Sequence, residues 1–426
     1  MRIQYKLEEK PPLPQSILLA IQHILAAFNG IVAVPLIVGG AAALNHENMT
    51  FYISAAIFCA GLVTIIQTTS PLGIGSRLPC VMGTSFTFVG PAVSVVKQFG
   101  MGAMFMATIF GTVVEIVASF FIPAVKKLFP RIVTSAVITL IGLSLVPVAV
   151  DWMAGGVGAK DYGSLSNLGV ALFVIIVIIV FISLKNKFLR TTGVFLGMLV
   201  GYITCILLGK LNFAPILKAD WFSFPMPFRF GFSFHWAPLL PFIIAYLVTT
   251  IETIGDLTAT ARVCDRSVTE KELKGGVLCD GVGSAIGGIM CGGANTTFSQ
   301  NIGIIGLTGV ASRYVVTIAG IILMILGICP KLGAVIATMP LPVLGGAGLI
   351  MFGMVASAGM SGMREAEPSY RNILIYTISV VCGLAVVFRP DILKNLPQML
   401  QILLNSGITT GAIVAIILNL ILPSEE

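Results

Sequence analysis

The sequence predicts an all-α polytopic membrane protein, and its composition, its length and its apolar runs support that class. Of 426 residues, 57% are hydrophobic and only 10% are charged, and the mean hydropathy is +1.00. A water-soluble core cannot cover so much apolar surface. At about 20 apolar residues per crossing, the chain has room for roughly 12 to 15 crossings. Runs such as 168–184 and 317–329 are apolar on every face, which excludes the alternating pattern of a β-barrel.

Fourteen segments are almost free of charge, and they divide equally between the two halves of the chain. We therefore expect seven transmembrane segments in each half. The first seven cover residues 16–40, 51–70, 78–96, 101–123, 132–150, 167–184 and 191–209. The second seven cover residues 236–261, 275–293, 294–308, 314–329, 332–358, 372–388 and 403–422.

The loop charges predict the orientation of these segments. With the amino terminus in the cytoplasm, 17 of the 25 Lys and Arg residues lie inside and 8 lie outside. This asymmetry favours fourteen crossings with both termini cytoplasmic, as in a plasma (inner) membrane protein. The net charge of +7 therefore reports orientation in the lipid bilayer and predicts no nucleic-acid partner. The first apolar run lacks a small-residue cleavage site and should remain as a helix.

An internal repeat links the two halves. Residues 84–87 (Thr-Ser-Phe-Thr) in the third segment match residues 296–299 (Thr-Thr-Phe-Ser) in the tenth, at an offset of 212 where half the chain is 213. A second echo pairs residues 130–131 (Pro-Arg) with 330–331 (Pro-Lys). Because each unit has an odd number of crossings, the second copy would be inverted in the membrane.

The matched third and tenth segments are short, interrupted and polar. The third contains Pro79, Gly83 and Pro91, and the tenth contains residues 292–297 (Gly-Gly-Ala-Asn-Thr-Thr) followed by a Gln-Asn pair at 300–301. Irregular backbone survives at membrane depth only where it is buried or lines a cavity. Two such segments at corresponding places predict a substrate site at the midplane, the alternative being two kinked and tightly packed helices.

Few titratable residues fall inside the predicted spans, and each is costly to bury. Glu252 and Asp256 are four residues apart on one helical face, which Thr249 and Thr253 extend. Two carboxylates on one face suit a proton-coupled carrier, although a structural hydrogen-bond network would use the same residues. The remaining titratable residues are His23, Glu115 and Asp280, with Asp151 at a helix end.

These remaining residues keep more than one interpretation each. His23 is either a satisfied helix contact or a proton carrier. Glu115 is expected to be a packing group or part of a dimer surface. Asp280 lies in a segment rich in glycine, which permits close helix approach, so we expect a fixed hydrogen-bond role or a proton relay.

Other protein classes lack their motifs in this sequence. The three histidines form no HExxH, no GxxxxGK[ST] phosphate loop occurs, and the eight cysteines contain no CxxC pair. We therefore expect no enzyme, no metal site and no cofactor, with the proton as the coupling ion. An intramembrane protease using Asp256 and Asp280 would need a fuller motif. A passive channel with a polar midplane stays open as an alternative.

The motifs resemble those of the nucleobase/ascorbate transporter family, the xanthine/uracil permeases. Residues 300–303 (Gln-Asn-Ile-Gly) with 308–309 (Thr-Gly) are similar to the family signature, residues 251–260 to its eighth helix, and Gln22-His23 to its first. The resemblance spans the whole chain. It implies a fourteen-helix, seven-plus-seven inverted repeat, and commonly a homodimer. It also implies a core domain (1–123 and 236–329) and a gate domain (124–235 and 330–426).

The resemblance also implies roles for individual residues. Glu252 and Gln300 would hold the nucleobase edge and Phe86 would stack on the ring, which suits the edge donors and flat face of a purine. Uracil carriers of the family usually have Glu in place of Gln300 and histidine in place of Asp256, so the resemblance favours xanthine or urate. The other implied residues are Ser85, Phe298 and Ser299 in the pocket, and Asn301, Asp256, His23 and Asp280 in site support or proton coupling.

Together these observations predict a proton-coupled symporter that imports a purine nucleobase, xanthine first, by alternating access. Ser85 departs from the asparagine of some xanthine carriers, so the exact purine stays open. Uric acid or uracil would be alternatives within the family. An uncoupled nucleobase channel is the alternative from another class.

Overall fold

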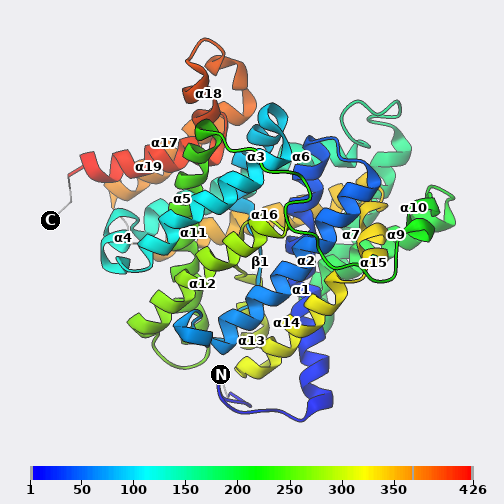
Figure 1. Cartoon of the computed structure of the whole chain (residues 1–426), viewed down its shortest axis with the longest axis horizontal. Helices are drawn as coiled ribbons and strands as arrows, with labels where there is room; N and C mark the ends of the chain where they lie inside the picture. The colour runs from blue at the N-terminus through cyan, green and yellow to red at the C-terminus, as the bar shows by residue number, and fades with distance from the viewer. Residues whose placement is uncertain (1–2, 367–368, 424–426) are drawn as a thin grey trace.

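The computed structural model describes residues 3–366 and 369–423, which form a bundle of helices (Figure 1). In the first half the α-helices are α1 (Leu13–Ala41), α2 (His46–Thr69), α3 (Val89–Ala118), α4 (Ile122–Leu128), α5 (Arg131–Ser144), α6 (Val146–Met153), α7 (Leu165–Ser183), α8 (Lys187–Thr191), α9 (Gly193–Leu207) and α10 (Ala214–Lys218). In the second half they are α11 (Trp236–Val263), α12 (Glu270–Ile289), α13 (Gln300–Thr308), α14 (Arg313–Gly327), α15 (Pro330–Ala337), α16 (Leu341–Glu365), α17 (Tyr370–Phe388), α18 (Gln398–Leu404) and α19 (Gly407–Ile421). Short 3-10 turns are η1 (Pro71–Gly73), η2 (Phe86–Phe88) and η3 (Pro390–Leu393).

The helical prediction is confirmed, and the interrupted third and tenth segments contain two short strands that the sequence did not indicate. β1 (Met82–Thr84) and β2 (Asn295–Thr297) form an antiparallel pair near the centre of the bundle (Figure 1). Backbone bonds from Ser85 to Ala294 and from Phe298 to Val81 extend the pairing. Buried extended backbone must find hydrogen-bond partners inside the protein, and here each interrupted segment satisfies the other.

The register of this pair supports the inverted repeat found in the sequence. Gly83 lies opposite Thr296, and Thr84 lies opposite Asn295. An offset of 212 converts the first of these pairs into the second, as a two-fold axis between antiparallel strands requires. In both units the strand is followed by a helix, α3 after η2 in the first and α13 in the second.

Eight helices in the described part of the chain are long and apolar enough to cross a membrane, or up to nine if α14 and α15 count as one bent span. Two shorter apolar helices, α9 and α19, add to these. The structure is thus a helical membrane fold, while the number of fourteen crossings stays a prediction. The predicted break between the third and fourth segments falls at Gly100, where φ is +81° inside α3.

The second sequence echo is wrong in its alignment. Pro330 opens α15, a helix of eight residues bent by 81° from α14. The long helix α16 begins later, at Leu341 after Pro340, just as α5 begins at Arg131 after Pro130. Pro340 and Pro130 thus take the same place, the N-cap, each before one of these helices.

The helices pack in two groups, and the strand pair lies in the first of them. The first group contains α1, α2, α3, α11, α12, α14 and both strands. The second contains α5, α6, α7, α9, α16, α17 and α19. Within the first group, the predicted close approach of the glycine-rich segment is confirmed. A Cβ on Gly281 of α12 would lie 2.9 Å from the Ile116 side chain of α3, so only a small residue fits there.

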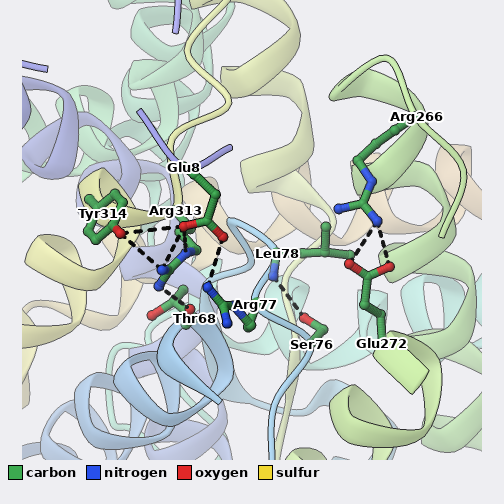
Figure 2. Close-up of polar contacts among 9 residues, drawn as sticks. All are labelled: Glu8, Thr68, Ser76, Arg77, Leu78, Arg266, Glu272, Arg313 and Tyr314. Carbon is green, nitrogen blue, oxygen red and sulfur yellow. Dashed lines mark hydrogen bonds and ion pairs between the residues drawn. The ribbon is translucent and has the colours of Figure 1, made fainter. Parts of the chain in front are cut away.

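The amino-terminal segment is held against the loop between α13 and α14. The Gln4 N–H donates to the Gly309 carbonyl at 2.8 Å. Figure 2 shows Glu8 between two cations, with its carboxylate 2.7 Å from the Arg313 guanidinium and 3.0 Å from that of Arg77. Hydrogen bonding to Arg313 and the nearby charges lower the pKa of Glu8 from its ordinary value. The segments that the charge asymmetry predicts to be cytoplasmic therefore meet at one end of the molecule.

Candidate substrate site and its buried polar network

A cavity of about 830 Å³ lies where the two helix groups meet. β1 and η2, α11, β2 and the start of α13 form one side of it, and α5 and α16 form the other. Apolar side chains such as Ile141 and Met354 cover part of the wall. The polar and charged lining residues include Thr84, Lys126, Arg131, Thr134, Glu252, Asp256, Thr258, Arg262, Thr296, Thr297, Ser299, Gln300 and Ser361.

Six of the ten site residues predicted from the sequence line this one cavity. They come from three places in the chain, since the strand-to-helix turns bring residues near 86 and near 300 together beside α11. The six are Phe86, Glu252, Asp256, Phe298, Ser299 and Gln300. Convergence of an amide, two carboxyl groups and two aromatic rings in a partly apolar cavity is typical of a small-molecule site.

Glu252 and Asp256 share one face of α11, as predicted from their spacing. Both are partly exposed in the cavity. The Thr87 hydroxyl donates to Glu252 Oε2 at 3.1 Å, and the Thr297 hydroxyl donates to Asp256 Oδ2 at 2.8 Å. Thr87 follows β1, and Thr297 is the last residue of β2. Each interrupted segment therefore supplies a hydroxyl to one of the two carboxyl groups.

Two phenylalanines form the aromatic part of the cavity. Phe86 meets the buried ring of Phe352 edge to face, with 5.8 Å between ring centroids. Phe298 packs against two glycines, and a Cβ on Gly30 or on Gly83 would lie 2.7 Å or 2.6 Å from its ring. The close approach to glycine fixes the Phe298 ring between α1 and β1, whereas Phe86 stays partly exposed and can meet a ligand.

The other predicted site residues lie outside the cavity lining. Ser85 is buried, and its hydroxyl has no hydrogen-bond partner among the described groups. Asn301 follows Gln300 but turns into the protein, where its amide nitrogen lies 3.0 Å from His23 Nδ1 and donates to the His23 carbonyl at 2.9 Å. His23 and Asn301 thus tie α1 to the first turn of α13, and their expected part in site support or proton coupling stays a prediction.

Asp280 also lies behind the cavity, at the centre of a buried hydroxyl network. Thr253 of α11 donates to Asp280 Oδ2, and Thr296 of β2 lies 3.5 Å from the same oxygen. Thr249 donates to Thr296 at 2.9 Å. The threonine stripe of α11 therefore binds β2 through Asp280, which agrees with the expected hydrogen-bond role.

Glu115 is not on a dimer surface. Its side chain is fully buried on α3, where its carboxyl group meets Asp280 and receives a long hydrogen bond of 3.4 Å from Thr250. The alternative from the sequence, a packing group, is the one that the structure supports. An apolar helix gives no signal of which side faces lipid, because both sides are apolar in a membrane protein.

The sequence interpretation missed two kinds of residue near the cavity. Thr87 and Thr297 belong to the repeated motif, but their hydroxyl bonds depend on strands that hydropathy does not reveal. Lys126, Arg131 and Arg262 line the cavity as well. The sequence feature that could have indicated this is their predicted position on the cytoplasmic side. Among the described residues, no group of three or more His, Cys, Asp or Glu side chains could hold a metal ion.

The structure is a helical membrane fold with a partly polar cavity between its two helix groups, and comparison with known structures finds the same kind of fold. The transmembrane domain of the cyanobacterial bicarbonate transporter BicA covers 91% of the chain and 98% of its own, with a TM-score of 0.60 at 17% identity. The structure of SLC26A9 gives a TM-score of 0.65 at 11% identity, over 90% of this chain and 66% of that one. At such identities the likeness shows the fold alone.

Sequence comparison identifies the family. The family model Xan_ur_permease, described as "Permease family", matches residues 14–392. A putative purine permease of Clostridium perfringens is 45% identical over 98% of this chain and 92% of its own length. A xanthine permease of Bacillus subtilis is 36% identical (95% and 92%), and the uric acid permease PucK of the same organism is 34% identical (97% and 96%). The chain belongs to the xanthine/uracil permease family, as its motifs predicted.

Proposed function

We propose that this permease is a secondary active symporter that brings an oxidised purine, xanthine, into the cell together with protons. The observation that carries the proposal is the presence of Gln300 and Glu252 in one cavity, next to the partly exposed ring of Phe86. A purine has a flat face for an aromatic ring and an edge of alternating donors and acceptors. A primary amide and a carboxyl group can pair with such an edge at two atoms each.

The names of the relatives support a purine as the substrate. The relatives are a putative purine permease, a xanthine permease and a uric acid permease. Gln300 offers both a donor and an acceptor, which xanthine can use, and uric acid differs from xanthine by one carbonyl on the imidazole ring. We therefore keep uric acid as the second candidate substrate.

Two carboxyl groups in the cavity support proton coupling. Glu252 and Asp256 both line the space that would receive the substrate, and each accepts a hydrogen bond from a threonine that can turn with its protonation state. A proton taken up by Glu252 turns an acceptor into a donor for the purine edge. Binding of the proton and of the purine would then depend on each other.

The packing of the helices supports alternating access between a core and a gate. The cavity lies between the two helix groups, whose members largely follow the core (1–123 and 236–329) and gate (124–235 and 330–426) divisions. In the proposed topology of fourteen crossings, with both termini cytoplasmic in the inner membrane, Lys126, Arg131 and Arg262 belong to the cytoplasmic side. The cavity then opens inward, and rocking of the core against the gate would open it outward. We also propose a homodimer, as is common in the family.

Uptake into proteoliposomes tests this function. Labelled xanthine should accumulate inside when an inward proton gradient is imposed, and an uncoupler should abolish the accumulation. Unlabelled urate, uracil, guanine and hypoxanthine compete in parallel assays, and strong competition by urate would favour the uric acid alternative. Equilibration without accumulation would contradict symport and favour an uncoupled channel, and absence of uptake for every purine would contradict the substrate class.

A further inference from the structure

Two carboxyl groups outside the lining of the substrate cavity lie in contact between α3 and α12. Glu115 and Asp280 are both 0% exposed, and their side chains are within hydrogen-bonding reach of each other. Glu115 Oε2 and Asp280 Oδ1 receive no hydrogen bond from any other described group. Close packing at Gly281 places the two helices near enough for this contact, since a Cβ there would lie 3.6 Å from Glu115 Cβ.

Among the described residues, the groups that act on the charge of this pair include no cation. The titratable groups that face it are Tyr246, Glu252 and Asp256 on α11 and Cys279 on α12. Two ionised carboxylates in contact in a medium of low dielectric repel each other strongly, and each would leave an oxygen without a partner. One proton between them removes the repulsion and gives both oxygens a hydrogen bond.

We propose that Glu115 and Asp280 hold one resident proton between them and serve as a positioning pair for the transport site. This inference rests on the proposed function of the cavity, because it assigns the transported proton to Glu252 and Asp256. The resident proton, in contrast, stays with the protein throughout the transport cycle.

The hydrogen-bond network between the pair and the cavity supports a resident proton. Thr253 donates its hydrogen to Asp280, and Thr297 donates its hydrogen to Asp256 at 2.8 Å. Thr297 also makes a second, longer contact, in which its hydroxyl points to the Thr253 hydroxyl oxygen at 3.4 Å. Because Thr297 makes its shorter bond to Asp256, the 3.4 Å contact with Thr253 is the weak link between the pair and the cavity, and neither Glu115 nor Asp280 lines the cavity.

The pair is connected to two elements of the cavity wall, α11 and β2. Asp280 receives the Thr253 hydroxyl from α11 and lies near the Thr296 hydroxyl of β2. Thr253 is next to Glu252, and Thr296 is in the strand that leads to Gln300. A proton shared with Glu115 holds Asp280 in place. Through Thr253 and Thr296, Asp280 then keeps Glu252 and Gln300, the residues proposed to bind the purine edge, in position relative to each other.

The variant Glu115→Gln separates a positioning role from a transported proton. A glutamine amide donates to the Asp280 carboxylate without any titrating proton, so gradient-driven xanthine uptake at neutral pH should stay within about threefold of wild type. The alkaline limb of the pH profile should extend to higher pH, because deprotonation can no longer break the contact. Glu115→Ala removes the partner altogether and should lower both uptake and the melting temperature. Loss of accumulation in Glu115→Gln with equilibrative exchange retained would overturn the proposal.

Infrared spectroscopy of the purified protein in lipid gives a second readout that needs no transport. Wild-type protein should show the carbonyl stretch of a protonated carboxylic acid that shifts only slowly in D2O. The band should persist in Glu252→Gln and disappear in Glu115→Gln. A wild-type spectrum without this slow band would overturn the resident proton, whereas a failure of wild-type protein to take up any purine would count against the proposed function alone.

Discussion

Two polar networks in this protein join segments that are distant in sequence, but they do so in opposite environments. Around Glu8, ion pairs between side chains connect the amino-terminal segment to Arg77 and Arg313 (Figure 2). Around Asp280, hydroxyl and carboxyl groups connect α3, α11, α12 and β2 without any cation. The Glu8 side chain is 52% exposed, while Asp280 is 0% exposed.

This difference in burial predicts which network the protein can lose with little change in stability. Water replaces a broken ion pair at the surface, so such a pair contributes roughly 0 to 1 kcal/mol. Water does not reach the fully buried network, and an unsatisfied buried group costs about 1 to 3 kcal/mol or more. The Asp280 network and the cavity carboxylates in front of it should therefore dominate function and stability, although the Glu8 network contains more formal charges.

The largest effect is expected at the cavity edge of the buried network, in Glu252→Gln. The amide keeps the size of the side chain and can still accept from Thr87, but it cannot take up a proton. Accumulation of labelled xanthine under a proton gradient should fall to the level of protein-free liposomes. Asp151→Asn, near the end of α6 and outside the cavity lining, serves as the control and should transport normally. Full accumulation by Glu252→Gln would remove this residue from proton coupling.

The next effect is expected in Thr253→Val, inside the network itself. Valine matches the shape of threonine but removes the hydroxyl that donates to Asp280, so the free energy of unfolding should fall by about 1 to 3 kcal/mol. Thr258→Val on the same helix is the matched control, because its hydroxyl only bonds back to the Ile254 carbonyl at 2.7 Å. Melting of both variants in the same detergent measures the difference. Equal melting temperatures would show that the buried network is as dispensable as the surface one.

Much of the site and of the buried network could be predicted from the sequence, because short motifs and residue spacings indicate them. The four-residue spacing of Glu252 and Asp256 places them on one helical face whatever surrounds the helix. The repeated motif at 84–87 and 296–299 identified both interrupted segments, and its offset agrees with the strand register. Glycine in the segment that became α12 indicated close packing, which the contact at Gly281 confirms.

The rest depends on contacts that no local pattern encodes. Three-residue strands are too short to show a periodicity. Each of them forms only by pairing with the other, which lies more than 200 residues away in the sequence. Hydropathy reports the transfer of a segment into lipid, so it could not show that Glu115 faces Asp280 rather than a partner subunit. It also could not show that Asp280 and Asn301 lie behind the cavity while Gln300 lies in it, because that choice is made by the turn between β2 and α13.

Gln300→Glu should have a smaller effect that concerns selectivity. The change removes the donor half of the amide and adds a charge at the recognition edge, so xanthine affinity should fall by about tenfold, or ~1.4 kcal/mol, and uracil should begin to compete. Competition assays with unlabelled xanthine and uracil measure both changes. Ser361→Ala, at a lining position on α16 across the cavity, is the control and should keep the wild-type preference. Unchanged selectivity in Gln300→Glu would exclude this side chain from the recognition edge.

The smallest effect is expected in the surface network, in Glu8→Gln. Because Arg313 and Arg77 lower the pKa of Glu8, its ionised form stabilises the fold above the ordinary value of 4.5, and this contribution disappears as the pH falls through the lower folded value. At neutral pH the variant should lose about 1 kcal/mol or less, and the difference from wild type should vanish in acid.

Melting temperatures across this pH range, measured in low salt, test the expected loss. Glu9→Gln is the matched control, because its amide can still accept the hydrogen bond that the Lys6 N–H donates to Glu9 at 2.9 Å, and it should melt like wild type. A loss in Glu8→Gln as large as that in Thr253→Val would reverse the comparison. Such a loss would come from Arg313, whose side chain is only 10% exposed. Without the Glu8 charge, this largely buried guanidinium would keep hydrogen bonds to the Thr68 carbonyl and the Tyr314 hydroxyl but would have no anionic partner there.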